Sequence, residues 1–299
     1  MKNSPALTSI RSTMIFLLVL MATLIGLSSV FEPATARLRA AAPVGTINSN
    51  YALLSEVFVS IAVFISLLIM RRIDKIPLAE RNFGKRPLFG KVAFGLAAGL
   101  STLAFVLLIQ LALGVLKITP SNEAVPLQIH DGVIWIQCFL ITGLCEEAVF
   151  RGYLLGALQK GLGFWPATAI SSVLFAVVHL PNSGERPSGI MVCVLFSVLF
   201  ALTVRLTGTI WFAVGFHAAW DWSQTYLFGT PDSGIRGNGH LLNSIPSGSD
   251  WLSGGVTGPE GSLITMLIVA VLIAFSITLC LHKVSPSVPD CQQNKALPV

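Results

Sequence analysis

The chain places ionisable side chains inside strongly apolar sequence, and three of them lie close together in CEEAVFRGYL, residues 145–154. Glu147 and Arg151 are four residues apart, so on a helix they share a face and can form an ion pair. Glu146 is rotated by about 100° from Glu147, which leaves its carboxylate free to point elsewhere. This spacing predicts one supporting carboxylate and one that is available for chemistry.

Two other stretches add further candidates to the same kind of sequence. FAVVH ends in His179, four residues after Phe175, and HAAWD contains His217 and Asp221, again four apart. Each pair therefore presents one stripe on its helix. Phe175 can serve in packing or in contact with a substrate. Glu56, in an earlier apolar stretch, is expected to make an inward polar contact.

The residue types suit two kinds of hydrolytic chemistry. A carboxylate and an imidazole together can deprotonate a water molecule. A second imidazole beside a short polar side chain can donate hydrogen bonds to a developing oxyanion, so an amide could be hydrolysed without a covalent intermediate. Glu146, His179 and His217 are also a zinc-ligand set with room for an activated water, although no His-Glu-x-x-His motif occurs. The residues alone leave both chemistries open.

The elements that must position these side chains are transmembrane helices. Of the 299 residues 54% are hydrophobic and only 11% are charged, against about 25% charged residues in a soluble domain. A span needs ~20 apolar residues to cross the hydrocarbon layer. The segments that approach this length are 14–30, 52–70, 92–116, 133–158, 166–181, 188–206, 209–228 and 262–282. We predict an all-α, polytopic transmembrane helical bundle of about eight spans, with the active site on the fourth, fifth and seventh.

The basic residues predict the orientation of the bundle. Residues 71–87 contain six Lys or Arg and two acids, so this loop and the N-terminus are expected in the cytoplasm. The net charge of +5 therefore reflects topology and does not indicate a nucleic-acid partner. Measured from the cytoplasmic ends of their spans, Glu146, His179 and His217 lie at depths of roughly 12–20 Å. They are expected to line one cavity near the midplane, open to the cytoplasmic side.

The remaining segments carry few chemical signals. The longest connection, residues 229–261, is rich in Gly, Ser and Pro and is expected outside, with His240 and Glu260 as solvated loop residues. The first span ends in ATA, residues 34–36, a pattern like a signal-peptidase site, but its full span length favours an uncleaved anchor. The cysteines show no Cys-x-x-Cys spacing and are expected to pack as small apolar residues, without disulfides or a zinc site: Cys138, Cys145, Cys193, Cys280 and Cys291.

The three polar stretches resemble the motifs of a known family. EEAVFR matches the Glu-Glu-x-x-x-Arg signature of the type II CAAX prenyl endopeptidases and their bacterial relatives, the CPBP (Abi) intramembrane proteases. FAVVH matches the family's Phe-x-x-x-His motif, and HAAWD matches its His-x-x-x-Asn/Asp motif. All three occur in the family's order, and the resemblance covers roughly residues 130–228.

The resemblance implies a role for each motif residue. Glu146 resembles the glutamate that, with His179, activates the hydrolytic water. Glu147 and Arg151 resemble the pair that orients the site. The family's oxyanion-stabilising motif falls on two residues of the seventh span, His217 and Asp221. An ionised Asp cannot donate a hydrogen bond, so the second of these must be protonated or must orient the histidine. Family members are described both as metal-free glutamate proteases and as metalloproteases, and we favour metal-free chemistry, with zinc as the alternative cofactor.

Together these features predict an intramembrane endopeptidase in a bacterial plasma membrane. We divide the chain into N-terminal helices with the basic loop (1–130), a catalytic core (131–228), and a Gly-rich external loop with the last helix and tail (229–299). The expected partners are the bilayer and a membrane-associated peptide or protein, either lipidated or not. The alternatives are a catalytically silent immunity or scaffold protein and a cation-coupled transporter. Transporters often carry inverted repeats, and the sequence has no internal repeat.

Overall fold

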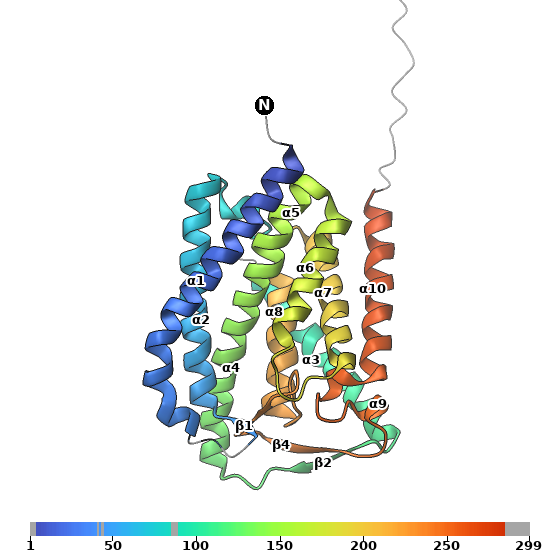
Figure 1. Ribbon diagram of the computed structural model, residues 1–299. Coiled ribbons are helices and arrows are strands. Elements are labelled where there is room, and N and C mark those ends of the chain that lie inside the picture. Colours follow the sequence, from blue (N-terminus) through green and yellow to red (C-terminus); the bar gives the residue numbers. More distant parts are fainter. Residues whose placement is uncertain (1–3, 41, 43–44, 85–88, 285–299) are drawn as a thin grey trace, which may run out of the picture.

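The chain forms a bundle of long helices in a computed structural model that describes residues 4–40, 42, 45–84 and 89–284 (Figure 1). The helices are α1 Pro5–Ala40, α2 Ser49–Asp74, α3 Phe89–Ala112, α4 Val125–Glu147, α5 Leu155–Leu162, α6 Phe164–His179, α7 Pro187–Thr207, α8 Trp211–Trp222, α9 Asp250–Ser253 and α10 Leu263–Val284. Segments of π-helix occupy Ala148–Leu154 and Ser223–Leu227, and 3₁₀ turns occupy Leu78–Glu80 and Pro259–Gly261. The predicted all-α bundle is confirmed.

The protein is an integral membrane protein. Within the described residues, six helices are long and apolar enough to cross a membrane: α1, α2, α3, the continuous run Val125–Leu162, α7 and α10. The predicted fifth and seventh spans correspond to shorter helices, α6 with 16 residues and α8 with 12. These two pack among the long helices, and they carry the histidine motifs.

The two ends of the bundle differ in content. The start of α1, the end of α10 and the 71–84 connection lie at one end, which we call the basic end (Figure 1). The other end, which we call the sheet end, carries two short two-stranded sheets. The strands are β1 Thr46–Ile47, β2 Leu116–Pro120, β3 Arg236–Gly237 and β4 Leu242–Pro246; β1 pairs with β3 in parallel and β2 with β4 antiparallel. These strands were not predicted from the sequence, and they fold the 229–261 connection onto the helices.

Close packing of glycines fixes the position of α8. Gly95 and Gly99 on α3 lie against the backbone of α8, where an added Cβ would meet the carbonyl oxygens of Phe212 and Phe216. Gly215 on α8 faces the backbone of α3 in the same way. Small residues let transmembrane helices approach until their backbones touch. The residues carried by α8 are therefore held at a set distance from α3.

The π-helical segment interrupts the helix that carries the glutamates. It follows Glu147 directly and contains Arg151, whose carbonyl accepts a hydrogen bond from the Asn82 side chain at 2.8 Å. A π-helical turn shifts the register of the backbone hydrogen bonds, and such turns occur often at functional sites. Here the connection after α2 supplies a donor to this altered turn.

Candidate active site

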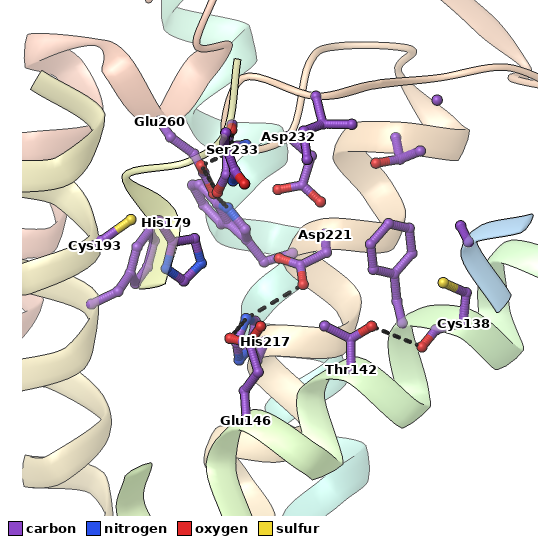
Figure 2. A pocket seen from close by; sticks show the side chains of 18 of the residues that line it. Cys138, Thr142, Glu146, His179, Cys193, His217, Asp221, Asp232, Ser233 and Glu260 are labelled. Atoms are coloured by element: carbon purple, nitrogen blue, oxygen red, sulfur yellow. Dashed lines mark hydrogen bonds and ion pairs between the residues drawn. The ribbon is translucent and has the colours of Figure 1, made fainter. Parts of the chain in front are cut away.

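A cavity of about 180 Å³ lies inside the bundle, toward the sheet end (Figure 2). Its walls come from α2, α4, α6, α7, α8 and the 229–261 connection. The predicted site residues that line it are Glu146, Phe175, His179, His217 and Asp221. The cavity therefore gathers residues of the predicted fourth, fifth and seventh spans.

Glu147 and Arg151 are fully buried and are not among the cavity-lining residues. Arg151 Nη1 donates to Glu147 Oε1 at 2.9 Å, which confirms the ion pair predicted from their spacing. The guanidinium also lies over the rings of Phe175, at 4.2 Å, and Phe200, at 5.2 Å. Charge pairing and cation–π contact together offset part of the cost of burying this arginine.

His217 connects the buried pair to the cavity. Its Nδ1 lies 3.0 Å from Glu147 Oε1, so the paired carboxylate can accept the proton on that nitrogen. Its Nε2 then points into the cavity, 3.7 Å from Glu146 Oε2 and 3.4 Å from Asp221 Oδ2. Glu147 thus sets the orientation of the imidazole, as second partners of functional histidines commonly do.

His179 lies on the opposite side of the cavity from Glu146 and His217 (Figure 2). Its Nδ1 donates to the carbonyl oxygen of Phe175 at 2.8 Å, which leaves Nε2 as the nitrogen available to a ligand. Within the described residues, no hydrogen bond or ion pair joins His179 directly to Glu146. A group between them would have to bridge the two.

The position of Phe175 is compatible with both predicted roles, packing and contact with a substrate. Its ring centroid lies 4.8 Å from that of His179 and 6.1 Å from that of His217. It also packs edge-on against Phe150 and covers the Arg151 guanidinium. The side chain is 3% exposed but borders the cavity, so it shapes the wall between the two histidines.

The 229–261 connection contributes acidic residues that the sequence analysis missed. Glu260 was expected to be solvated, but it is 6% exposed and lines the cavity. Its Oε1 accepts from Trp220 Nε1 at 2.8 Å and from Gln224 Nε2 at 3.0 Å, and its Oε2 accepts from the backbone and hydroxyl of Ser233. Asp232 also lines the cavity. The expectation was wrong because the strands fold this connection inward; a carboxylate directly preceding an apolar span was the available signal.

His240 differs from Glu260. It is half-buried, its Nε2 lies 2.6 Å from Asn243 Oδ1, and it is not among the residues that line the cavity. Its expected solvation is therefore only partly correct, and it has no place in the site.

The two predictions about sidedness do not fit one fold. The residues of strands and connections that border the cavity are Ile47, Asn182, Asp232, Ser233, Ile235, Gly237 and Glu260, and all of them belong to the sheet end. Residues 71–84 of the basic loop lie at the other end (Figure 1). A basic loop in the cytoplasm and a cavity open to the cytoplasm are therefore not both compatible with this arrangement, because depth counted along single helices says nothing of the side on which loops close a cavity.

A zinc site requires ligand atoms that lie close to one another. Among the described residues, the His, Cys, Asp or Glu side chains whose ligand atoms lie within 4.8 Å of one another are Asp221, Asp232 and Glu260. Glu146, His179 and His217 do not form such a group in this part of the chain, although His217 Nε2 and Glu146 Oε2 are near each other. The three side chains therefore line one cavity, but their ligand atoms do not surround a single metal position in this arrangement.

The described cysteines, Cys138, Cys145, Cys193 and Cys280, are free and buried, as expected; Cys291 lies outside the described residues. Cys138 and Cys193 border the cavity. Both pack against apolar neighbours in the core.

One region of the chain matches a known family. Residues 128–223 match the family model described as type II CAAX prenyl endopeptidase Rce1-like. The match contains all three polar motifs, and it ends before the connection that supplies Asp232 and Glu260. A search of curated proteins finds no match to the chain. Residues 128–223 are therefore similar to the type II CAAX prenyl endopeptidases, the family that the three motifs indicate.

Proposed function

We propose that the protein is an intramembrane endopeptidase that hydrolyses a peptide bond with a water molecule activated by Glu146 and His179. The observation that carries this proposal is the convergence of Glu146, His179 and His217 on one cavity from three different helices. Ionisable residues are costly inside a membrane, so their convergence on an enclosed space indicates function. The match of residues 128–223 to the family model supports the same class of activity.

The proposed mechanism uses only groups of this chain. Glu146 takes a proton from a water held between its carboxylate and His179 Nε2, and the hydroxide attacks the carbonyl carbon of the scissile bond. His217, in its imidazolium form, donates from Nε2 to the oxyanion that develops. Glu146 then returns its proton to the leaving amine as the carbon–nitrogen bond breaks. Each proton and bond is accounted for without a covalent enzyme intermediate.

Glu147, Arg151 and Asp221 are proposed to hold His217 in position. The Glu147 carboxylate lies at Nδ1 and is fixed by Arg151, so the ring cannot rotate without losing a buried hydrogen bond. Asp221 Oδ2 lies 3.4 Å from Nε2, a distance that suits an orienting carboxylate. Of the two roles that its side chain allows, we therefore assign orientation of the histidine.

The orientation proposed from the basic loop limits the substrate. With the N-terminus in the cytoplasm, the sheet end and the cavity loops face outward. A substrate segment would then reach the cavity from the outer half of the membrane. We propose membrane-embedded peptides or proteins of a bacterial plasma membrane as substrates, with lipidated segments included in the test.

The proposal is tested with full-length protein in detergent and a library of quenched-fluorescent peptides, including prenylated tails. We expect Glu146→Gln and His179→Ala each to lower kcat/KM by about 10²–10⁴-fold, since each removes a group that handles the proton. Glu32→Gln is the matched control, because Glu32 lies on the exposed surface of α1 and pairs only with Arg39.

Other results would favour the alternatives. Absence of cleavage by folded wild type, with ion flux in proteoliposomes, would favour a transporter. Absence of both would favour a silent immunity or scaffold protein. Activity that is lost with a chelator and restored by zinc would replace the metal-free mechanism.

A further inference from the structure

The charged side chains around the cavity are strongly unbalanced in sign. Five of the residues that line it are carboxylic acids: Glu56, Glu146, Asp221, Asp232 and Glu260. Among the described residues that line it, none is Lys or Arg, and the buried Arg151 is already paired with Glu147. A substrate group that enters this cavity therefore meets an environment able to bind positive charge.

Four of the five carboxylates interact with His217 or with side chains around the 229–261 connection. Glu146 and Asp221 face His217, and Glu260 accepts hydrogen bonds from Trp220, Gln224 and Ser233. The side chain of Gln224 also donates to Asp232 at 3.2 Å. These four carboxylates are engaged by the catalytic histidine or by neutral donors.

Glu56 is the fifth, and it stands apart from the catalytic motifs. It lies on α2, outside the region that matches the family model, and it faces the cavity beside Thr142. Its carboxylate has the Thr142 side chain as a hydrogen-bond partner and interacts with His217 at longer range, but in the described part of the chain no Lys, Arg or His forms an ion pair with it. A carboxylate in a membrane helix without a cation is costly, so a cationic ligand would offset part of that cost.

Peptide chemistry offers a suitable cation. A Lys or Arg side chain next to the scissile bond would bring a positive charge into the cavity while Glu146 and His179 act on the carbonyl. A free carboxylate a few residues from the bond would instead add negative charge where no lining Lys or Arg receives it. Electrostatic complementarity of this kind selects among partners.

We infer that Glu56 is a specificity-determining residue that binds a basic side chain of the substrate beside the scissile bond. The inference rests on the proposed endopeptidase activity. It makes the preferred substrate a membrane-associated segment with Lys or Arg near the cleavage point, in place of a short tail that ends in a free carboxylate.

The test uses one cleavable membrane peptide in three versions, with Lys, norleucine or Glu at each position flanking the mapped cleavage site. We expect wild type to cleave the best Lys peptide at least about tenfold faster, in kcat/KM, than its norleucine counterpart, with the Glu peptide slowest. Glu56→Gln is expected to bring the Lys-to-norleucine ratio close to one. Glu56→Asp and the surface control Glu32→Gln are expected to keep the preference for Lys.

Each outcome has a defined meaning. Equal rates for Lys and norleucine peptides with wild type would overturn the inference while leaving the endopeptidase intact. A preference that survives Glu56→Gln would assign it to another carboxylate and overturn the role of Glu56. If Glu56→Gln fails to fold, a competition assay with wild type replaces it. The Lys peptide is then expected to inhibit cleavage of a reference peptide more strongly than the norleucine peptide does, and equal inhibition would overturn the inference. If folded wild type cleaved none of the peptides, the proposed function itself would be overturned.

Discussion

Two buried polar clusters lie at opposite ends of this bundle, and they are built differently. At the basic end, Asp74 accepts hydrogen bonds from Arg81 at 2.6 Å, from Tyr153 at 2.6 Å and from Ser12 at 2.8 Å. The Arg81 guanidinium also lies 4.4 Å from the centre of the Tyr153 ring. We call these four residues the basic-end network. In it, one carboxylate and one guanidinium balance each other in charge.

The cavity end has no such balance. Its carboxylates, Glu56, Glu146, Asp221, Asp232 and Glu260, outnumber the cationic groups that face them. A paired network holds helices together, whereas an unbalanced one adds cost and persists where it serves binding or catalysis. The comparison indicates that the basic-end network is structural and that the cavity cluster is functional.

The largest expected effect is on the basic-end network. Asp74→Asn should lower the free energy of unfolding by about 3–5 kcal/mol, because it leaves Arg81 buried without its counter-charge. Thermal unfolding in detergent measures the change. The double variant Asp74→Asn/Arg81→Met should recover part of the loss.

The control for this prediction is Glu32→Gln, which removes one member of an exposed pair with Arg39 and should change stability by less than about 1 kcal/mol. Equal effects of Asp74→Asn and Glu32→Gln would contradict a structural role for the buried network.

The next effect concerns the helix that holds the cavity cluster in place. Gly99→Ala should cost about 1–3 kcal/mol and reduce peptide cleavage, because its Cβ meets the Phe216 backbone and displaces the helix that carries His217. Gly26→Ala is the matched control: its Cβ would enter open space, so the better helix propensity should stabilise the protein by up to about 1 kcal/mol. A Gly99→Ala protein as stable and active as wild type would show that α8 can move without harm to the site.

The smallest effect is a pH dependence at the sheet end. Burial, followed by repulsion from Glu260, raises the pKa of Glu185 from 4.5 to about 7. Burial and the charge of Glu260 also raise the pKa of nearby Asp232 well above its usual range. Because the folded state holds these protons more tightly, their contribution to stability is complete below pH 4.5 and, for Glu185, is lost as the pH rises through about 7.

Unfolding temperatures measured between about pH 4.5 and pH 8 test this dependence. We expect Glu185→Gln to flatten the decline and Glu32→Gln to leave it unchanged. Identical slopes for wild type and Glu185→Gln would remove Glu185 as a cause. The opposite slope, with stability rising over this range, would contradict the assigned sign.

The sequence was sufficient for features that depend on local spacing. Apolar length predicted the bundle, and the four-residue separations predicted the Glu147–Arg151 pair and the His217–Asp221 contact. These predictions succeed because a helix fixes which neighbours share a face before any tertiary contact forms. The same spacing indicated that Glu146 is free of the arginine, and its carboxylate does face the cavity.

Contacts between distant segments were beyond the reach of the sequence. The hydrogen bond of His217 to Glu147 joins residues of two helices, and the glycines of α3 set the position of one of them. The inward fold of Asp232 and Glu260 depends on strand pairing between connections far apart in the chain. Periodicity carries no information on such pairings.

From the amino-acid sequence alone it can be predicted that this protein crosses a membrane, which ionisable side chains lie in its spans, and which of them are neighbours on one helix. The position of the cavity at the sheet end, and the presence of Glu56 and Glu260 in its wall, are seen only in the tertiary structure. This difference arises because helix formation and membrane insertion follow local composition. The charge balance of a cavity, in contrast, is the sum of side chains that several separate segments bring together.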